Sequence, residues 1–226
     1  MPSRAATANL FAVVVAAVAW PALMLQYWLI LWSGPPLEVT VRFLSFFTIL
    51  SNLLVGLVAG SAATGGNWAF LRLWRGPRVR GLAALSITVT CLVYAFVLQA
   101  QFHPQGPALL ADRSLHYAVP ALYVFWWAAL LPHGTLLWAD ALRWLAFPAV
   151  YAAWTLLRGA IVHDYPYPFM NVDRLGYGQV LLNSGMVALL FLAIGLIYVA
   201  LDRKLAPRPV YCLLYTSDAA DEATIV

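Results

Sequence analysis

The sequence predicts an all-α fold, a polytopic membrane protein built as a bundle of six transmembrane helices. Of its 226 residues, 63% are hydrophobic and only 10% are charged, whereas a soluble domain carries about 25% charged residues. Apolar runs of about 18 residues or more recur along the chain, and each is long enough to cross a hydrocarbon core of about 30 Å. We expect helices at residues 8–32, 41–62, 82–101, 115–131, 136–157 and 177–201.

The first helix follows Arg4 and contains the small-residue sequence AVA, a pattern also found in signal peptides. Its apolar sequence continues through Pro21 to Trp32, which is too long for the hydrophobic region of a signal peptide. We therefore expect residues 8–32 to span the membrane, with a kink at the proline.

The second helix carries an unusual polar stripe in the sequence RFLSFFTILSNLL, Arg42 to Leu54. At about 100° per residue, Ser45, Thr48 and Asn52 fall within roughly 60° of one another on a helix. The third helix ends with VLQAQFHP, which adds Gln99. Buried hydroxyl and amide groups need hydrogen-bond partners, so this stripe is expected to face the interior of the bundle.

The other three helices add further polar groups. The fourth begins with SLHYAVP, which places His116 one turn inside the predicted span. The fifth carries Asp140 and Arg143 at a spacing of three, which favours an ion pair. The sixth begins with GYGQVLLNSG and contributes Asn183. An ionisable group inside a span is a functional candidate by default, so His116 is the residue of most interest.

The distribution of basic residues predicts the orientation. Arg72, Arg75, Arg78 and Arg80 lie between the second and third helices, on the same side as both ends of the chain. The positive-inside rule places this side in the cytoplasm, with both termini there. Twelve arginines against one lysine suggest a bacterial protein of the inner (plasma) membrane. Positive and aromatic flanks of this kind are routine in membrane proteins, so no nucleic-acid partner is expected.

The last fifteen residues differ from the rest of the chain. The sequence CLLYTSDAADE, Cys212 to Glu222, resembles the translation of an adapter used in preparing sequencing libraries. We therefore divide the chain into a six-helix transmembrane domain, residues 1–211, and an adapter-derived non-native tail, residues 212–226. Cys91 is then the only native cysteine, which leaves no partner for an internal disulfide.

A hydroxyl and a histidine at similar depth indicate one chemistry. A neutral His116 beside Ser45 or Thr48 would take the hydroxyl proton as the oxygen attacks a carbonyl carbon. The amides of Asn52, Asn183 and Gln99 would bind the substrate, and one of the two asparagines would donate to the developing oxyanion. Each of these polar groups also has a structural interpretation, as a hydrogen-bonding contact between helices.

Classes of membrane protein that depend on a cofactor fit this sequence less well. The lysine that retinal requires is absent from the spans, and a haem protein normally needs pairs of histidines inside its helices. His103, His116 and His163 all fall on the outer side, but their separations match no metal motif. We therefore expect no cofactor and no metal.

The chain resembles the bacterial Pr6Pr family of membrane proteins and, more distantly, the androgen-induced six-helix hydrolases of animals. The similarity rests on RFLSFFTILSNLL, LHYAVPALYVFWW and YPYPFMNV, in this order, and runs through nearly the whole native chain. The animal proteins hydrolyse fatty acid esters of hydroxy fatty acids with a membrane-embedded Thr and a His. The resemblance places their nucleophile at Ser45, their histidine at His116 and their YPF motif at Tyr167-Pro168-Phe169, with Thr48 as the substitute nucleophile.

The sequence therefore supports a lipid-ester hydrolase that uses an intramembrane Ser or Thr and a His. Its partners would be membrane lipids, including a lipid ester as the substrate. The alternative is a membrane protein without catalysis, which would act as a structural component or bind a small molecule.

Overall fold

The computed structural model describes residues 3–66 and 68–207, and all the regular elements in these ranges are helical. The expected tail, residues 212–226, lies outside them. The α-helices are α1 (Arg4–Ile30), α2 (Pro36–Leu44), α3 (Phe47–Thr64), α4 (Ala69–Trp74), α5 (Pro77–Val93), α6 (Pro107–Arg113), α7 (Val119–Leu130), α8 (Trp138–Arg143), α9 (Ala146–Val162) and α10 (Val172–Lys204). Shorter helical turns are η1 (Leu31–Ser33), η2 (Tyr94–Leu98), η3 (Gln99–Gln101), η4 (Ser114–Ala118) and η5 (Pro168–Met170).

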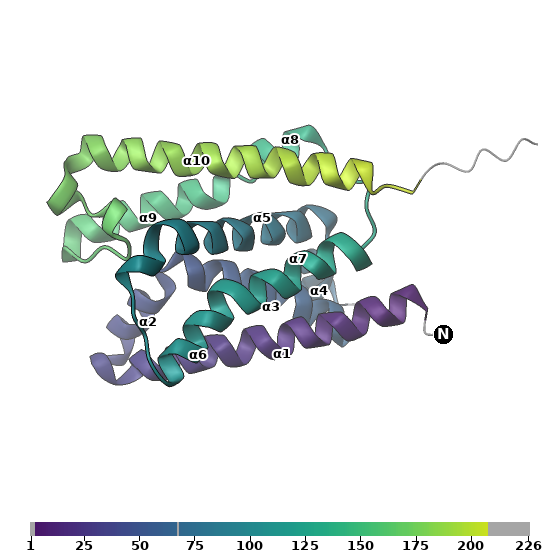
Figure 1. The fold of residues 1–226 in the computed structure, drawn as a ribbon, viewed down its shortest axis with the longest axis horizontal. Coiled ribbons are helices and arrows are strands. Elements are labelled where there is room, and N and C mark those ends of the chain that lie inside the picture. The colour runs from purple at the N-terminus through teal and green to yellow at the C-terminus, as the bar shows by residue number, and fades with distance from the viewer. Residues whose placement is uncertain (1–2, 67, 208–226) are drawn as a thin grey trace, which may run out of the picture.

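The long helices run side by side as an elongated bundle (Figure 1). On one side α1 packs against α3 and α7, and α5 in turn packs against α3, α7 and α10. α10 also contacts α8 and α9 and covers the opposite side of the bundle (Figure 1). The core between these helices is rich in aromatic side chains, and Tyr123, Trp126 and Phe191 are almost completely buried.

Among the described residues, five segments are long and apolar enough to cross a membrane: Arg4–Ser33, Phe47–Thr64, Pro77–Gln101, Trp138–Val162 and Val172–Lys204. Together they make the molecule an all-helical protein with several potential membrane-spanning helices. The predicted fourth span, residues 115–131, corresponds to the continuous helical stretch of α6, η4 and α7, residues 107–130. This stretch carries Arg113 and His116, which lower its hydropathy, and it is not among the five. The count of six spans therefore remains a prediction.

The expected helix at 41–62 is two helices rather than one, which corrects the prediction. α2 ends at Leu44, and α3 begins at Phe47 after Phe46 adopts an extended conformation with φ −90° and ψ 127°. Ser45 therefore lies at the end of one helix, and Thr48 and Asn52 lie on the next. A break among apolar side chains is tolerated only where other groups bond the freed backbone. Tyr151 does so here, since its hydroxyl donates to the carbonyl of Ser45 at 3.1 Å.

The fifth predicted helix is also divided, into α8 and α9, at Trp144 and Leu145. The predicted pair of Asp140 and Arg143 is confirmed, with 2.7 Å between Oδ1 and Nη1. Arg78 also contacts this carboxylate, at 3.1 Å from its Nε. α8 is thereby joined to the start of α5.

Two π-helical turns interrupt the long helices near α3. η2 continues α5 from Tyr94, and η4 joins α6 to α7 at Ser114–Ala118. Such turns are rare and often occur at functional sites. These two contain Tyr94 and His116, whose rings stack on each other.

Candidate active site

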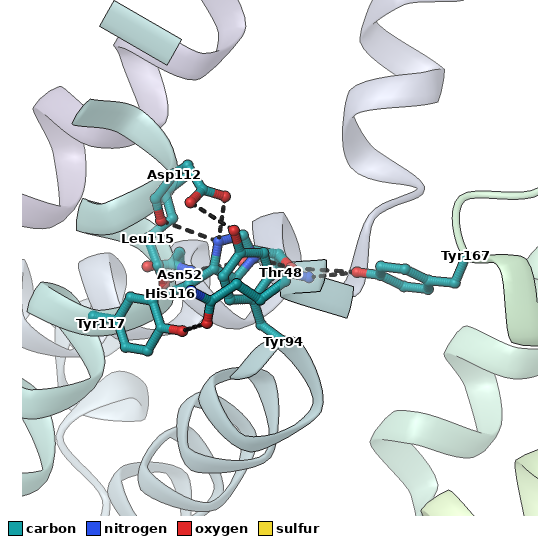
Figure 2. Close-up of polar contacts among 9 residues, drawn as sticks. Thr48, Asn52, Tyr94, Asp112, Leu115, His116, Tyr117 and Tyr167 are labelled. Carbon is teal, nitrogen blue, oxygen red and sulfur yellow. Dashed lines mark hydrogen bonds and ion pairs between the residues drawn. The ribbon is translucent and has the colours of Figure 1, made fainter. Parts of the chain in front are cut away.

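Thr48 lies in the first turn of α3, directly after the break in the helix. Its hydroxyl oxygen is 3.2 Å from Nε2 of His116 and 3.3 Å from the hydroxyl oxygen of Tyr167. The backbone N–H of Thr48 donates to the same tyrosine hydroxyl at 3.1 Å. Figure 2 shows Thr48 between the two rings, with His116 on one side and Tyr167 on the other. A hydroxyl within hydrogen-bond distance of an imidazole nitrogen can act as a nucleophile, because the imidazole can accept its proton.

The contacts of His116 determine its tautomer. Its Nδ1 lies 3.1 Å from Oδ1 of Asp112 and 3.0 Å from the backbone carbonyl oxygen of the same residue. Both are acceptors, so the proton of a neutral ring belongs on Nδ1. Nε2 then carries a lone pair directed at the hydroxyl of Thr48. This is the tautomer that a general base requires.

Asp112 and Tyr94 hold this ring in place. The Tyr94 hydroxyl donates to Oδ2 of Asp112 at 2.7 Å, and its ring stacks on His116 with 3.7 Å between centroids and 11° between planes. The Asp112 carboxylate thus contacts both His116 and Tyr94 and lies behind the imidazole ring, on the side away from Thr48.

Asn52 connects α3 to the π-turn that carries His116. Its amide nitrogen donates to the carbonyl of Thr48 at 2.8 Å and to that of Leu115 at 3.1 Å. The carbonyl of Leu115 is free because the N–H of Val119 bonds Ser114 instead. The next residue along the chain is Pro120, which has no N–H. Because both hydrogens of its amide are used, Asn52 positions the site and does not serve as the expected oxyanion donor.

The start of α3 supplies a favourable field for negative charge. Its first-turn N–H groups lie beside Thr48, and the positive end of the helix dipole points toward the same place. The Tyr167 hydroxyl accepts the Thr48 N–H and keeps its own hydrogen available for donation. A hydroxyl donor at a helix N-terminus is suited to stabilise an oxyanion.

Two cavities meet at Thr48 and Tyr167, which line both. The apolar cavity has a volume of about 410 Å³, and its wall includes Val89, Val187 and Phe191. It suits a hydrocarbon chain, because most of its lining is aliphatic or aromatic.

The second, the histidine cavity, has a volume of about 540 Å³. Its wall includes Asp112 and His116 together with Arg42 and His103. It therefore combines the candidate catalytic groups with a cationic side chain. The reactive hydroxyl would meet a chain from one side and a polar group from the other.

Ser45 is placed away from His116, which corrects the expectation that the two face each other. Its hydroxyl donates to the carbonyl of Val41 at 2.7 Å and accepts the indole N–H of Trp154 at 3.1 Å. Both contacts are structural and lie at the end of α2. Thr48, the substitute nucleophile, is the residue that bonds to His116.

Asn183 and Gln99, two of the expected substrate-binding residues, also lie outside this cluster. Asn183 on α10 donates to the carbonyl of Phe169 at 2.8 Å and accepts from Gln179 at 2.9 Å. Gln99 accepts the hydroxyl of Tyr117. In the described part of the chain neither amide bonds to Thr48 or His116, so their role in binding a substrate stays a prediction.

Three residues of the cluster had no assigned role in the sequence analysis: Asp112, Tyr94 and Tyr167. Asp112 precedes His116 by four residues, a helical spacing that brings side chains together and signals the pair. Tyr167 belongs to the YPF motif, although nothing in that motif shows its contact with Thr48. Tyr94 has no local signal, because only the tertiary structure stacks it on the imidazole.

Comparisons of the chain with protein-family models, with curated proteins and with solved structures find no match. The site is therefore interpreted from its own geometry.

Proposed function

We propose that the protein hydrolyses lipid esters, with Thr48 as the nucleophile and His116 as the general base. The observation that carries this proposal is the chain of contacts from Thr48 Oγ1 to His116 Nε2 at 3.2 Å and from His116 Nδ1 to Asp112 Oδ1 at 3.1 Å. Hydroxyl, imidazole and carboxylate in this order form a nucleophile, a base and an orienting anion.

In the first step the Thr48 oxygen bonds to the ester carbonyl carbon while its proton passes to Nε2 of His116. The carbonyl oxygen becomes an oxyanion, and collapse of this intermediate breaks the bond to the alcohol oxygen. His116 returns the proton to the departing alkoxide, which leaves an acyl group on Thr48. Water, deprotonated by the same imidazole, then releases the fatty acid and restores the hydroxyl.

Charge stabilisation is assigned to Tyr167 and to the start of α3. The oxyanion would accept the Tyr167 hydroxyl, whose oxygen is 3.3 Å from the attacking oxygen. Asp112 would stabilise the imidazolium that forms beside it, since its carboxylate faces Nδ1. Such preorganised groups typically account for much of the rate enhancement of acyl-transfer enzymes.

The cavities support a lipid ester as the substrate. The acyl chain would occupy the apolar cavity, with its carbonyl at Thr48. The leaving group would occupy the histidine cavity, where Arg42 would attract a carboxylate or another anionic group. The resemblance to hydrolases of fatty acid esters of hydroxy fatty acids implies a substrate of this kind, with a chain on each side of the ester.

We further infer that residues 107–130 are a sixth membrane span, the fourth in chain order, and that both termini are cytoplasmic in a bacterial plasma membrane. The support is the length of this helical stretch and the group of arginines at the start of α5. A periplasm-active reporter fused after Pro107 is expected to be active, and one fused after Arg78 silent. The reverse pattern would invert the orientation.

A fluorophosphonate reagent, which captures activated hydroxyls, tests the catalytic proposal on the purified protein. Thr48→Ala and His116→Ala are each expected to abolish labelling and ester hydrolysis, because one removes the nucleophile and the other its base. Thr48→Ser keeps a hydroxyl and is expected to keep labelling. Hydrolysis is measured with fluorogenic esters of increasing acyl length.

Ser45→Ala is the matched control, since it removes a buried hydroxyl three residues from Thr48 that bonds Val41 and Trp154 instead. It is expected to leave labelling intact. Loss of labelling in Ser45→Ala with retention in Thr48→Ala would overturn the assignment of the nucleophile.

A second candidate function is the binding of a lipid without catalysis, and the two adjoining cavities favour it. Binding alone predicts that fatty acids and esters co-purify or raise the melting temperature, while neither labelling nor turnover occurs. In that case Thr48→Ala and wild type would bind equally.

A further inference from the structure

A third cavity, which we call the arginine cavity, is lined by residues from the start of α1 and from the segments that follow α7 and α10. Figure 1 shows that these helix ends lie at the same end of the bundle. Its volume is about 830 Å³, and its wall includes Arg4, Arg75 and Arg80. Among the described residues that line it, none is Asp or Glu. The cavity therefore gathers three permanent positive charges without a lining carboxylate.

Only some of the N–H donors of the three guanidinium groups have a hydrogen-bond acceptor among the described residues, and these acceptors are neutral backbone carbonyls. Arg4 donates to the carbonyl of Ala129 at 3.3 Å, and Arg75 donates to the carbonyl of Ser61. The Nε of Arg80 is buried and has no hydrogen-bond partner within residues 3–66 and 68–207. A buried guanidinium nitrogen without an acceptor is costly, so this one favours an anion in the cavity.

The carboxylates of Asp202 and Asp140 already have other partners among the described residues. Asp202 contacts Nδ1 of His133 at 3.2 Å and accepts the backbone N–H of Leu136 at 2.8 Å. Asp140 pairs with Arg78 and Arg143. In the described part of the chain, neither forms an ion pair with the arginines of the cavity.

Apart from Asn9 and His133, the rest of the wall is mostly apolar. Trp126, Leu130, Leu131 and Ala62 line the cavity next to the arginines. Trp126 is fixed by a hydrogen bond from its indole N–H to the carbonyl of Ala8 at 2.8 Å. A site with guanidinium groups and an apolar wall suits a phosphate ester attached to a hydrocarbon group. The reason is that one guanidinium group can bind two phosphate oxygens at once.

We propose that the arginine cavity binds a phosphate ester, held by Arg4, Arg75 and Arg80, with its organic part against the partly exposed Leu130. The headgroup of an anionic phospholipid fits this chemistry, and so does a soluble phosphate compound. Basic pockets between helices at a membrane surface bind such headgroups. The site lies at the opposite end of the bundle from the break before α3 and is independent of the hydrolase proposal.

Native mass spectrometry of the full chain in detergent tests the proposal. Phosphatidylglycerol is the anionic probe, phosphatidylcholine the zwitterionic control, and inorganic phosphate a competitor. We expect preferential retention of phosphatidylglycerol and a higher melting temperature when it is bound. Arg80→Gln and Arg4→Gln should each weaken its binding about fivefold, the typical effect of one arginine near an anionic surface. Arg4 is exposed, so its variant tests the site even if Arg80→Gln folds poorly.

Arg72→Gln is the matched control, because it makes the same change in charge at an exposed position that does not line the cavity. It should bind phosphatidylglycerol as wild type does. Displacement of the lipid by millimolar phosphate would support the site and identify a soluble phosphate as its ligand, while no displacement would favour the lipid. Equal retention of the two lipids, or equal weakening in Arg72→Gln and Arg4→Gln, would overturn the proposal.

Discussion

Tyr167→Phe is the substitution that most directly examines charge stabilisation at the site. It removes one oxygen and keeps the ring, which stacks on Phe169 with 5.4 Å between centroids and packs edge-on against Phe46 at 5.9 Å. The lost oxygen accepts the N–H of Thr48 at 3.1 Å and lies 3.3 Å from its hydroxyl. The packing of the site is thus preserved while its proposed oxyanion donor is removed.

The expected magnitudes follow from these contacts. Loss of one oxyanion donor lowers kcat by about 10²- to 10³-fold. The effect on KM is small, because the hydrogen bond to the oxyanion forms only in the transition state. Loss of a side-chain hydrogen bond inside a membrane protein costs about 0.6 kcal/mol on average and about 1.7 kcal/mol at most. The variant is therefore expected to fold with a slightly lower melting temperature.

Tyr151→Phe provides the comparison. Tyr151 is also buried, and its hydroxyl donates to the carbonyl of Ser45 at 3.1 Å on the other side of the helix break. It should lose similar stability and retain most of its kcat. Both variants are assayed with a fluorogenic lipid ester and by thermal unfolding in detergent. A wild-type kcat in Tyr167→Phe, or equal kcat losses in the two variants, would refute the role of Tyr167.

Three other changes have defined outcomes. Asp112→Asn removes the anion behind the imidazole and should lower kcat by about 10²- to 10⁴-fold, and an unchanged pH–rate profile with full kcat would contradict this. Gly81→Ala would place a Cβ 2.6 Å from the ring of Trp144 and should destabilise the protein by about 1–3 kcal/mol, whereas Gly178→Ala enters open space and should not, which thermal unfolding compares. Ala188→Trp fills the apolar cavity and should lower kcat/KM for long-chain esters more than for short-chain esters, and equal losses would count against that cavity as the acyl site.

The hydrophobic pattern predicted the helices well because membrane spans are specified by length and apolar content. The segments around residues 8–32, 82–101 and 177–201 all lie within longer helical segments, Arg4–Ser33, Pro77–Gln101 and Val172–Lys204. The break at Ser45 and Phe46 could not be predicted in this way, since the local sequence contains neither Gly nor Pro. The freed carbonyl of Ser45 is bonded by Tyr151 on α9, a contact between residues far apart in the sequence.

The candidate site was predicted in part. His116 and Thr48 were identified because polar groups inside apolar helices are costly and must meet partners. The choice of Ser45 assumed an unbroken helix, and the break redirects its hydroxyl toward Val41 and Trp154. Tertiary packing alone brings Tyr94 to the imidazole, so no analysis of helical periodicity would include it.

The identity of the reactive hydroxyl is the central claim, and the position of a fluorophosphonate adduct tests it most directly. Trypsin cleaves after Arg42 and Arg72, so both Ser45 and Thr48 fall in the single peptide 43–72. Fragmentation of this peptide by tandem mass spectrometry separates the two sites, because they are three residues apart. The adduct is predicted on Thr48 and is expected to disappear in His116→Ala. An adduct on Ser45, or labelling that persists without the imidazole, would contradict the proposed mechanism.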